Sequence, residues 1–216
     1  MTEGPLSRVT ILDLTDERGI YGAKLLADLG ANVIRPEPLT GDPLRMRGPF
    51  IQSADQGKES IWHAYFCSSR RSIALDLGDA EGLEQFDLLL TKADIVLTCP
   101  GAFGVEESKE IVRDKNREEL VFIDTCSFRP GCEWADYQAP DIVAGALAGQ
   151  IATTGDADTA PLKNFGELNF MVSGAYTAIS ALSALYNRRA TGSGQRVEVS
   201  VHECIASCLE LSLIHI

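Results

Sequence analysis

Short apolar runs and helical repeats of apolar residues alternate along the first part of the chain. Val9–Leu14 is an apolar run, β-branched at its start, which predicts a buried strand. Tyr21–Leu29 has apolar residues at helical spacing and is followed by a glycine, which predicts a helix. Ala31–Ile34 is a second predicted strand, which we expect Pro36 and Pro38 to end. A strand, a crossover helix and a second strand form a βαβ unit.

The alternation of strands and helices continues through the first 125 residues, and further elements follow to the end of the chain. Further strands are predicted at 72–77, 94–97, 120–124 and 196–201, and helices at 80–92, 106–117, 141–150, 172–186 and from 202 onward. Residues 45–60 and 130–140 are predicted to be polar and irregular. This order favours an α/β fold with a doubly wound, mostly parallel, Rossmann-like sheet. Such sheets bind ligands beyond the carboxyl ends of their strands, where Gly19, Gly22 and the turn Gly41–Arg45 are expected to lie.

The end of the chain differs from the rest. We expect one large domain over residues 1–200, and residues 201–216 to begin a following helix. That helix is still apolar at Leu211–Ile216, with no cap and no polar tail. We therefore expect the chain to be a fragment with a truncated C-terminal part.

Composition narrows the classes of partner. The net charge of −12 argues against nucleic acid and against an anionic membrane. No run of consecutive apolar residues approaches the roughly 18 of a membrane span, and the N-terminus lacks a signal peptide's basic and apolar regions. The six cysteines form no C-x-x-C pair, although Cys204 and Cys208 would share a helix face near His202. We expect buried thiols in a reducing cytoplasm and no metal site.

Four sequence blocks, taken in order and separation, resemble one family. The blocks are Ile11–Thr15, Leu25–Ile34 with the turn Gly41–Arg45, Arg70–Leu77 and Thr191–Ser200. They resemble the class III coenzyme A transferases, which include the formyl-CoA and carnitine-CoA transferases, over nearly the whole chain. The resemblance implies the family's Rossmann-like large domain, with coenzyme A and acyl-CoA as substrates and no permanently bound cofactor. It also implies small carboxylates as partners, and either an interlocked homodimer or a second CoA-transferase domain in tandem.

The resemblance implies transfer of coenzyme A between carboxylic acids. In the family an aspartate attacks the acyl-CoA thioester, and mixed anhydride and aspartyl-CoA intermediates follow. That aspartate lies four residues before a glycine that opens a long helix. The matching glycine is Gly174, and the matched position is Phe170, which cannot attack a thioester. Asn169 beside it is not a carboxylate, and Glu167 lies three residues upstream.

We therefore expect a catalytically silent half that supports an active partner domain. One alternative is an active CoA-transferase that uses the displaced carboxylate of Glu167 or a carboxylate from a partner chain. Another is a nucleotide-binding Rossmann domain, although the chain has no G-x-G-x-x-G motif.

Contacts with coenzyme A are carried over from the resemblance. The expected contacts are Glu17, Gly19, Arg45, Arg70 and Arg71. Basic side chains hold phosphates by charge-assisted hydrogen bonds, and amides near a glycine can hold an oxyanion. The family's Ala-Gly-Pro after the first strand is replaced here by Arg18–Ile20.

Each of these residues also has a structural interpretation. The arginines are equally typical of a solvated surface, and Gly19 and Gly22 of a tight strand-to-helix turn. Asp42 is expected to be a turn residue. Asp141, which follows a proline, is expected to be an N-cap, with a catalytic role as the alternative. His63 is expected to pack in the core.

Overall fold

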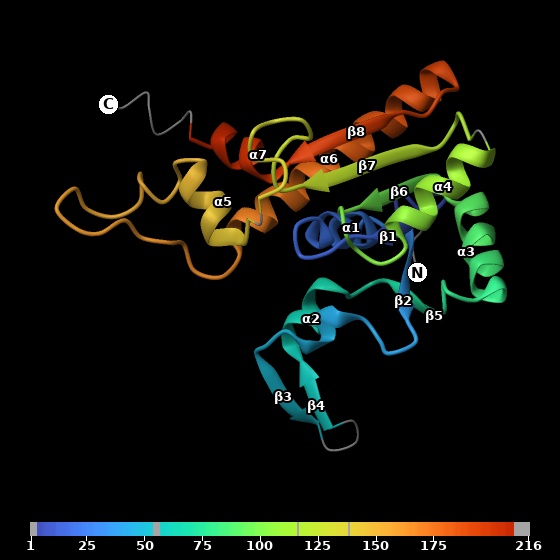
Figure 1. Ribbon diagram of the computed structural model, residues 1–216, viewed down its shortest axis with the longest axis horizontal. Helices are drawn as coiled ribbons and strands as arrows, with labels where there is room; N and C mark the ends of the chain where they lie inside the picture. Colours follow the sequence, from blue (N-terminus) through green and yellow to red (C-terminus); the bar gives the residue numbers. More distant parts are fainter. Residues whose placement is uncertain (1–3, 54–56, 116, 138, 210–216) are drawn as a thin grey trace.

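A six-stranded parallel sheet forms the centre of the molecule (Figure 1). The computed structural model describes residues 4–53, 57–115, 117–137 and 139–209. The strand order is β5-β2-β1-β6-β7-β8. The strands are β1 (Thr10–Leu14), β2 (Asn32–Pro38), β5 (Arg71–Leu75), β6 (Ile95–Thr98), β7 (Val121–Cys126) and β8 (Arg196–Ser200). Each neighbouring pair is parallel, which confirms the predicted doubly wound α/β fold.

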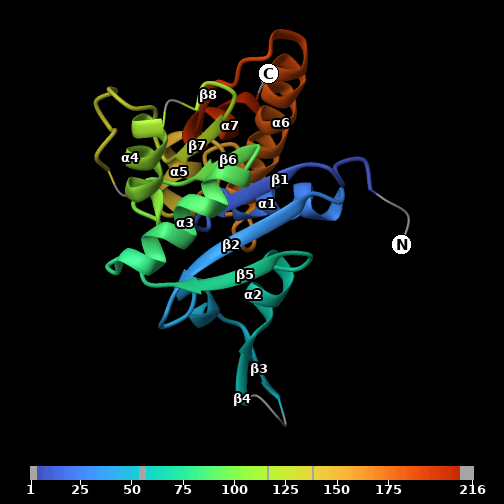
Figure 2. The same cartoon turned by 90° about the vertical axis from the view of Figure 1, so that its right-hand side faces the viewer.

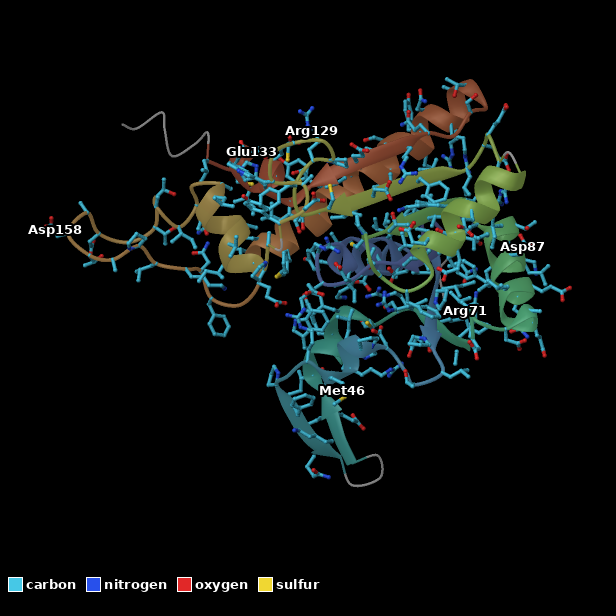
Figure 3. The ribbon with its side chains drawn as sticks, in the orientation of Figure 1. Met46, Arg71, Asp87, Arg129, Glu133 and Asp158 are labelled. Atoms are coloured by element: carbon cyan, nitrogen blue, oxygen red, sulfur yellow. The ribbon has the colours of Figure 1, made fainter. Side chains whose placement is uncertain are left out.

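Helices cover both faces of the sheet (Figure 2). One face carries α1 (Ile20–Asp28) and α6 (Leu168–Thr191), and the other carries α3 (Ala80–Lys92), on which Asp87 is labelled in Figure 3, and α4 (Val105–Lys115). The short helices α5 (Asp141–Leu147) and α7 (Val201–Ser207) pack against the start of α6. Along β1, Ile11 packs in the cluster that includes α1 and α6, whereas Leu12 packs in the cluster that includes α3. Successive side chains of a strand point to opposite faces, so a strand buried on both sides is apolar throughout. This explains the continuous apolar runs in the sequence.

The prediction that Pro36 and Pro38 end the second strand is wrong for Pro36, which lies inside β2, and correct for Pro38, where β2 ends. Pro36 and Pro38 pair with Ile73 and Leu75 of β5. The pairing of β2 with β1 stops at Ile34. Proline has no N–H to donate to a neighbouring strand. Because the two prolines are two residues apart, their nitrogens face the same edge of β2, the edge away from β5, and beyond Ile34 no strand at that edge needs a donor.

The prediction of an irregular segment at 45–60 is also wrong. It contains an antiparallel hairpin, β3 (Phe50–Ser53) and β4 (Gly57–Ser60), preceded by a 3₁₀ turn (Pro43–Met46) and followed by α2 (Ile61–Phe66). The hairpin projects away from the main sheet in both ribbon views. Because it buries little apolar surface, its sequence lacks the alternation that marks a strand.

Two glycines bring α1 and α6 together. A Cβ on Gly22 would lie 2.5 Å from the carbonyl oxygen of Gly174, and one on Gly174 would lie 2.7 Å from the Cβ of Tyr21. Gly22 therefore lies inside α1, where the lack of a side chain lets α6 approach closely, and it does not form the turn before α1. α6 begins at Leu168, earlier than the predicted 172, so Gly174 lies inside the helix and not at its start.

α6 is long and apolar enough, by composition, to cross a membrane, yet half of that window is buried inside the protein. Ala178, Ala181 and Ala184 lie in the core. These are the features of a central core helix.

The predictions for the cysteines are confirmed only in part, and the prediction for the end of the chain falls on residues that the structure does not describe. Cys99, Cys126 and Cys204 are buried as predicted, but Cys208, at the end of α7, is exposed. Residues 210–216, with the apolar end of the chain, lie outside the described residues.

Candidate functional site

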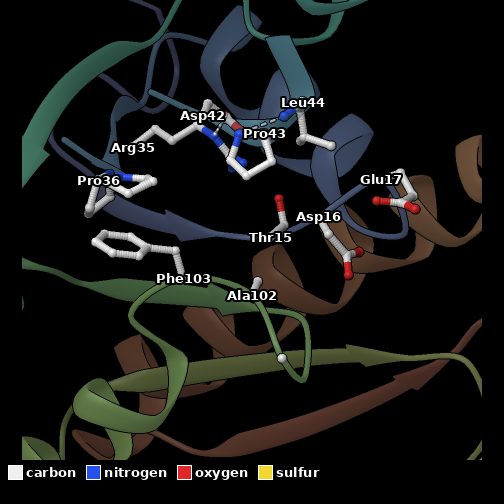
Figure 4. Close-up of a pocket in the computed structure, with 12 residues that line it drawn as sticks. Thr15, Asp16, Glu17, Arg35, Pro36, Asp42, Pro43, Leu44, Ala102 and Phe103 are labelled. Atoms are coloured by element: carbon white, nitrogen blue, oxygen red, sulfur yellow. Dashed lines mark hydrogen bonds and ion pairs between the residues drawn. The ribbon is translucent and has the colours of Figure 1, made fainter. Parts of the chain in front are cut away.

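The strand order creates a crevice between β1 and β6. From β1 the chain proceeds to β2 and β5 on one side, and then to β6, β7 and β8 on the other. In open parallel sheets, ligands bind at such a reversal point, beyond the carboxyl ends of the strands. A hollow of about 220 Å³ lies here, lined by Thr15, Glu17 and the segment Gly101–Phe103. Figure 4 shows the Phe103 ring beside Pro36 and the Thr15 hydroxyl between the two walls.

Two larger hollows lie near the first. One, of about 450 Å³, shares Asp16 and Glu17 with it and is also lined by Arg18 and Phe170. The other, of about 790 Å³, shares Pro140 with the second. Shared lining residues therefore relate the three hollows as a series from the end of β2 to the start of α6.

A buried ion network supports the crevice from below. The Asp13 carboxylate, with no exposed side-chain surface, pairs with Arg35 at 3.2 Å and with Arg70. Arg35 also pairs with Asp42 (Figure 4). Burial alone would raise the pKa of Asp13, but the two guanidinium groups, together with hydrogen bonds from Thr15, outweigh burial and lower it. The network fixes the end of β1 to β2 and to the start of β5.

Asp42 is a turn residue, as predicted. Its carboxylate accepts from the backbone N–H of Leu44 at 2.9 Å and caps the 3₁₀ turn. Its own N–H donates to Glu37 at 3.0 Å, and Glu37 in turn pairs with Arg45 at 2.7 Å. The guanidinium of Arg45 holds the pKa of Glu37 below its usual range, against the opposing effect of burial.

The five residues expected to contact coenzyme A are not all together. Glu17 lines the first two hollows, and Gly19 precedes α1 where a Cβ would lie 2.9 Å from Thr15 Cγ2. Arg45 follows Leu44, which lines the first hollow, but Arg45 itself is not a lining residue; its side chain is 47% exposed and pairs with Glu37. Arg70 is only 2% exposed and is held by Asp13. Arg71 bonds to Asn32 at the first residue of β2, toward the opposite end of the strands.

His63 faces the network from α2. Its Nε2 lies 3.8 Å from Asp42 Oδ2 and has no hydrogen-bond partner among the described residues. Asp42, His63 and Cys67 each place a potential metal-ligand atom within 4.8 Å of the others. Buried nitrogens of Arg35 and Arg70 also lack hydrogen-bond acceptors in this part of the chain. Because Arg35 already pairs with the Asp42 carboxylate, a cation at this cluster would compete with a buried guanidinium group, which makes the cluster a poor site for a cation.

Phe170 is buried at the start of α6. It is 4% exposed and packs in a small core with Ala144 and Ile205. Its backbone N–H donates to Asp141 Oδ2 at 3.2 Å, and the Asn169 amide donates to Asp141 Oδ1 at 3.1 Å. The carboxylate nearest to the Phe170 backbone in this arrangement is therefore that of Asp141.

The prediction that Asp141 is an N-cap is wrong by one residue. Pro140 occupies the cap position, and Asp141 lies in the first turn of α5. Its carboxylate bonds across to α6 and pairs with Lys163 at 3.3 Å. Asp141 therefore joins α5, α6 and the segment between them.

Glu167 is also held in place. Its carboxylate pairs with Arg47 and accepts from Trp62 Nε1 at 3.1 Å. The Arg47 guanidinium stacks on the Trp62 ring at 4.7 Å and approaches Glu17 at 3.4 Å. These contacts connect the hairpin segment to α6. Nothing in the sequence singled out Arg47, because its partners are distant in the chain.

Arg18 was noted in the sequence only as a departure from the family. Its side chain pairs with Asp16 and donates to the Pro100 carbonyl at 2.8 Å. The Arg18 carbonyl accepts from Ser173 of α6 at 2.6 Å. Arg18 therefore fastens the end of β1 to the loop after β6 and to α6.

Comparison with known proteins decides the family. Residues 6–215 match CoA-transferase family III. The chain belongs to CoA-transferase family III. It is 34% identical over 208 residues to the succinyl-CoA:(R)-benzylsuccinate CoA-transferase subunit BbsE of Thauera aromatica, covering 94% of this chain and 50% of that protein. It is 32% identical to the succinyl-CoA:mesaconate CoA-transferase of Haloarcula hispanica, covering 96% of this chain and 54% of that protein.

Solved structures of the family agree with the fold. A CAIB/BAIF family protein from Brucella suis superposes with a TM-score of 0.84 at 27% identity, over 99% of this chain and 57% of that one. The present chain spans about half the length of the curated relatives it matches.

Proposed function

We propose that this chain binds coenzyme A thioesters along the crevice and does not itself supply the attacking carboxylate. On this proposal, transfer of coenzyme A between carboxylic acids requires a carboxylate from a second chain or a second domain. The burial of Phe170 at the matched nucleophile position carries the proposal.

The series of hollows supports thioester binding. The first hollow lies at the reversal point of the sheet, and the partly exposed Arg45 follows its lining residue Leu44 in the chain. We assign this end to the nucleotide and phosphates, with Glu17 and Gly19 as further contacts. The thioester then lies in the second hollow, between Arg18 and Phe170. Arg70 acts from beneath as a positioning residue, because Asp13 holds its guanidinium.

Two carboxylates near Phe170 are the alternatives to a silent chain. Glu167 is engaged by Arg47 and Trp62, and moving it to the Phe170 position would break both contacts. Asp141 already lies beside the Phe170 N–H, but both of its oxygens accept hydrogen bonds. A carboxylate whose lone pairs are occupied by donors is a weakened nucleophile. These contacts favour the silent chain.

Binding is tested by calorimetric titration of the purified chain with coenzyme A. We expect saturable binding that Arg45→Gln weakens by about fivefold, the usual size for one exposed phosphate contact. Arg129→Gln is the matched control, since Arg129 is an exposed arginine 67% open to solvent. Absence of binding would refute the assignment of the crevice.

Catalysis is tested separately with acetyl-CoA or succinyl-CoA as donor and oxalate or succinate as acceptor. We expect no transfer and no covalent coenzyme A adduct by intact-protein mass spectrometry. Turnover that is lost in Glu167→Gln or in Asp141→Asn would overturn the silent-chain proposal and identify the nucleophile. Phe170→Asp tests whether restoring the carboxylate is enough, and an adduct in this variant would show that the pocket is otherwise intact.

A further inference from the structure

The largest of the three hollows is apolar. It lies between α2 and the start of α6, has a volume of about 790 Å³, and is larger than the two hollows assigned to the nucleotide and the thioester. Its apolar lining includes Pro49, Trp62, Phe66, Ile142, Leu168 and Met171. On the α2 wall, Trp62 packs on Phe66 with ring centroids 4.5 Å apart. A large apolar hollow of this kind is typical of a small-molecule site.

The hollow continues directly from the thioester position. Pro140 lines both this hollow and the one that contains Phe170. Met171, the next residue after Phe170, lines the apolar hollow. Asp141 also lines it while accepting the Phe170 N–H. A group attached to a thioester carbonyl near Phe170 would therefore extend past Pro140 into this space.

The charged groups around the hollow are already paired. Arg47 faces the carboxylates of Glu17 and Glu167, and Lys163 faces that of Asp141. Three carboxylates against two cations leave an excess of one negative charge. A further carboxylate on the bound group would be repelled, and neither cation is free to receive it. Arg47 instead closes the wall by stacking on Trp62.

We infer that this hollow receives the acyl group of the thioester and selects bulky, uncharged apolar acyl groups, aryl or branched alkyl, over short dicarboxylyl groups. This inference rests on the proposed function, since it places the acyl group by continuity with the coenzyme A crevice. It assigns the specificity of the site to α2, to Met171 and to Ile142.

The test compares calorimetric affinities of the purified chain for coenzyme A, acetyl-CoA, succinyl-CoA and phenylacetyl-CoA. We expect phenylacetyl-CoA to bind at least about tenfold more tightly than acetyl-CoA, the difference that burial of one aromatic ring supplies. Succinyl-CoA should bind no better than acetyl-CoA. Met171→Trp fills the hollow and should abolish the preference while coenzyme A itself still binds. Ile179→Trp is the matched control, on the same helix at an exposed position.

The outcomes separate the two proposals. Equal affinities for the acyl-CoAs, with coenzyme A still bound, would overturn the inference and leave the proposed function standing. Failure of coenzyme A and every thioester to bind would overturn both. A second copy of the chain is the competing occupant of an apolar hollow. Loss of self-association in Met171→Trp by sedimentation velocity, without acyl selectivity in the unaltered chain, would assign the hollow to that interface.

Discussion

The strand ends beneath the crevice and the first turns of α6 bury their polar groups in different ways. Beneath the crevice, the carboxylates of Asp13 and Asp42 and the guanidinium groups of Arg35 and Arg70 neutralise one another with almost no exposed side-chain surface. At the start of α6, Asp141 accepts hydrogen bonds from a backbone and an amide, around a buried phenylalanine. The first region depends on compensated charge. The second depends on apolar packing around Phe170, with the Asp141 carboxylate held by two neutral donors and by one partly exposed cation, Lys163.

This difference teaches which part of the site tolerates change. A buried ion pair cannot lose one member cheaply, because the other remains charged and desolvated. A packed aromatic ring can replace a reactive carboxylate if its neighbours fit the ring, and Phe170 has such neighbours in Ala144, Val201 and Ile205. On our proposal, the chain keeps the support of the crevice and lacks the reacting group.

Asp13→Asn should have the largest effect on stability. It leaves the guanidinium groups of Arg35 and Arg70 buried without their shared counter-charge, which costs about 3–5 kcal/mol. Urea denaturation measures the change in free energy of unfolding. Asp28→Asn, which removes an exposed pair with Lys24, is the control and should cost about 0.5 kcal/mol or less. A cost for Asp13→Asn as small as the control would mean that the network is not a coupled unit.

Phe170→Ala should cost nearly as much, about 3 kcal/mol, because it removes a buried ring and leaves a cavity among Ala144 and Ile205. The same denaturation measures it. Phe165→Ala is the matched control, since the Phe165 side chain is fully exposed, and it should change stability by about 0.5 kcal/mol or less. If Phe170→Ala were equally neutral, the start of α6 would not be packed as described.

Gly22→Ala should cost about 2 kcal/mol, because its Cβ would meet the carbonyl of Gly174 at 2.5 Å and force α1 from α6. Gly174→Ala should have a similar cost. Once one methyl group has separated the helices, the second adds less, so the double variant should cost less than the sum. A fully additive double variant, measured in the same urea experiment, would argue that the two glycines act independently.

The sequence was sufficient where one local pattern determined one element. Apolar runs and, for β8, an alternating pattern located all six strands of the main sheet, the order of strands and helices predicted the ligand position beyond the strand ends, and the four blocks identified the family. The hairpin escaped because its strands bury too little to show a pattern. Arg47 escaped because its partners, Glu17 and Glu167, are far apart in the chain.

The prediction of contacts with coenzyme A was limited by the same cause, because the partners of these side chains are distant in the sequence. An arginine in a motif has the same sequence signature whether its guanidinium meets solvent or a buried carboxylate. Arg45, half exposed, and Arg70, buried against Asp13, therefore looked alike. Asp141 was noticed for its proline, but its bond to the Phe170 N–H spans 29 residues and follows only from the fold.

The smallest expected effect on stability comes from the titration of His63, which lies at the edge of the ion network. Burial lowers its pKa, and the charge of Arg45 lowers it further, while Asp42 and Glu37 oppose them and Arg35 adds to the lowering. The unfolded chain therefore takes up a proton at higher pH than the folded chain does. Stability should fall as pH decreases from about 6.5, the ordinary value for histidine, through the lower folded pKa.

His63→Gln should remove this loss, so that the free energy of unfolding falls less between pH 7.5 and pH 5.5 than in the unaltered chain. Urea denaturation at both values measures the difference. If Asp42, at 3.8 Å, dominated instead, protonation would form an ion pair and stability would rise as pH falls. His63→Gln would then remove a gain in stability. The sign of the change thus tells whether desolvation or the neighbouring carboxylate governs the edge of the network.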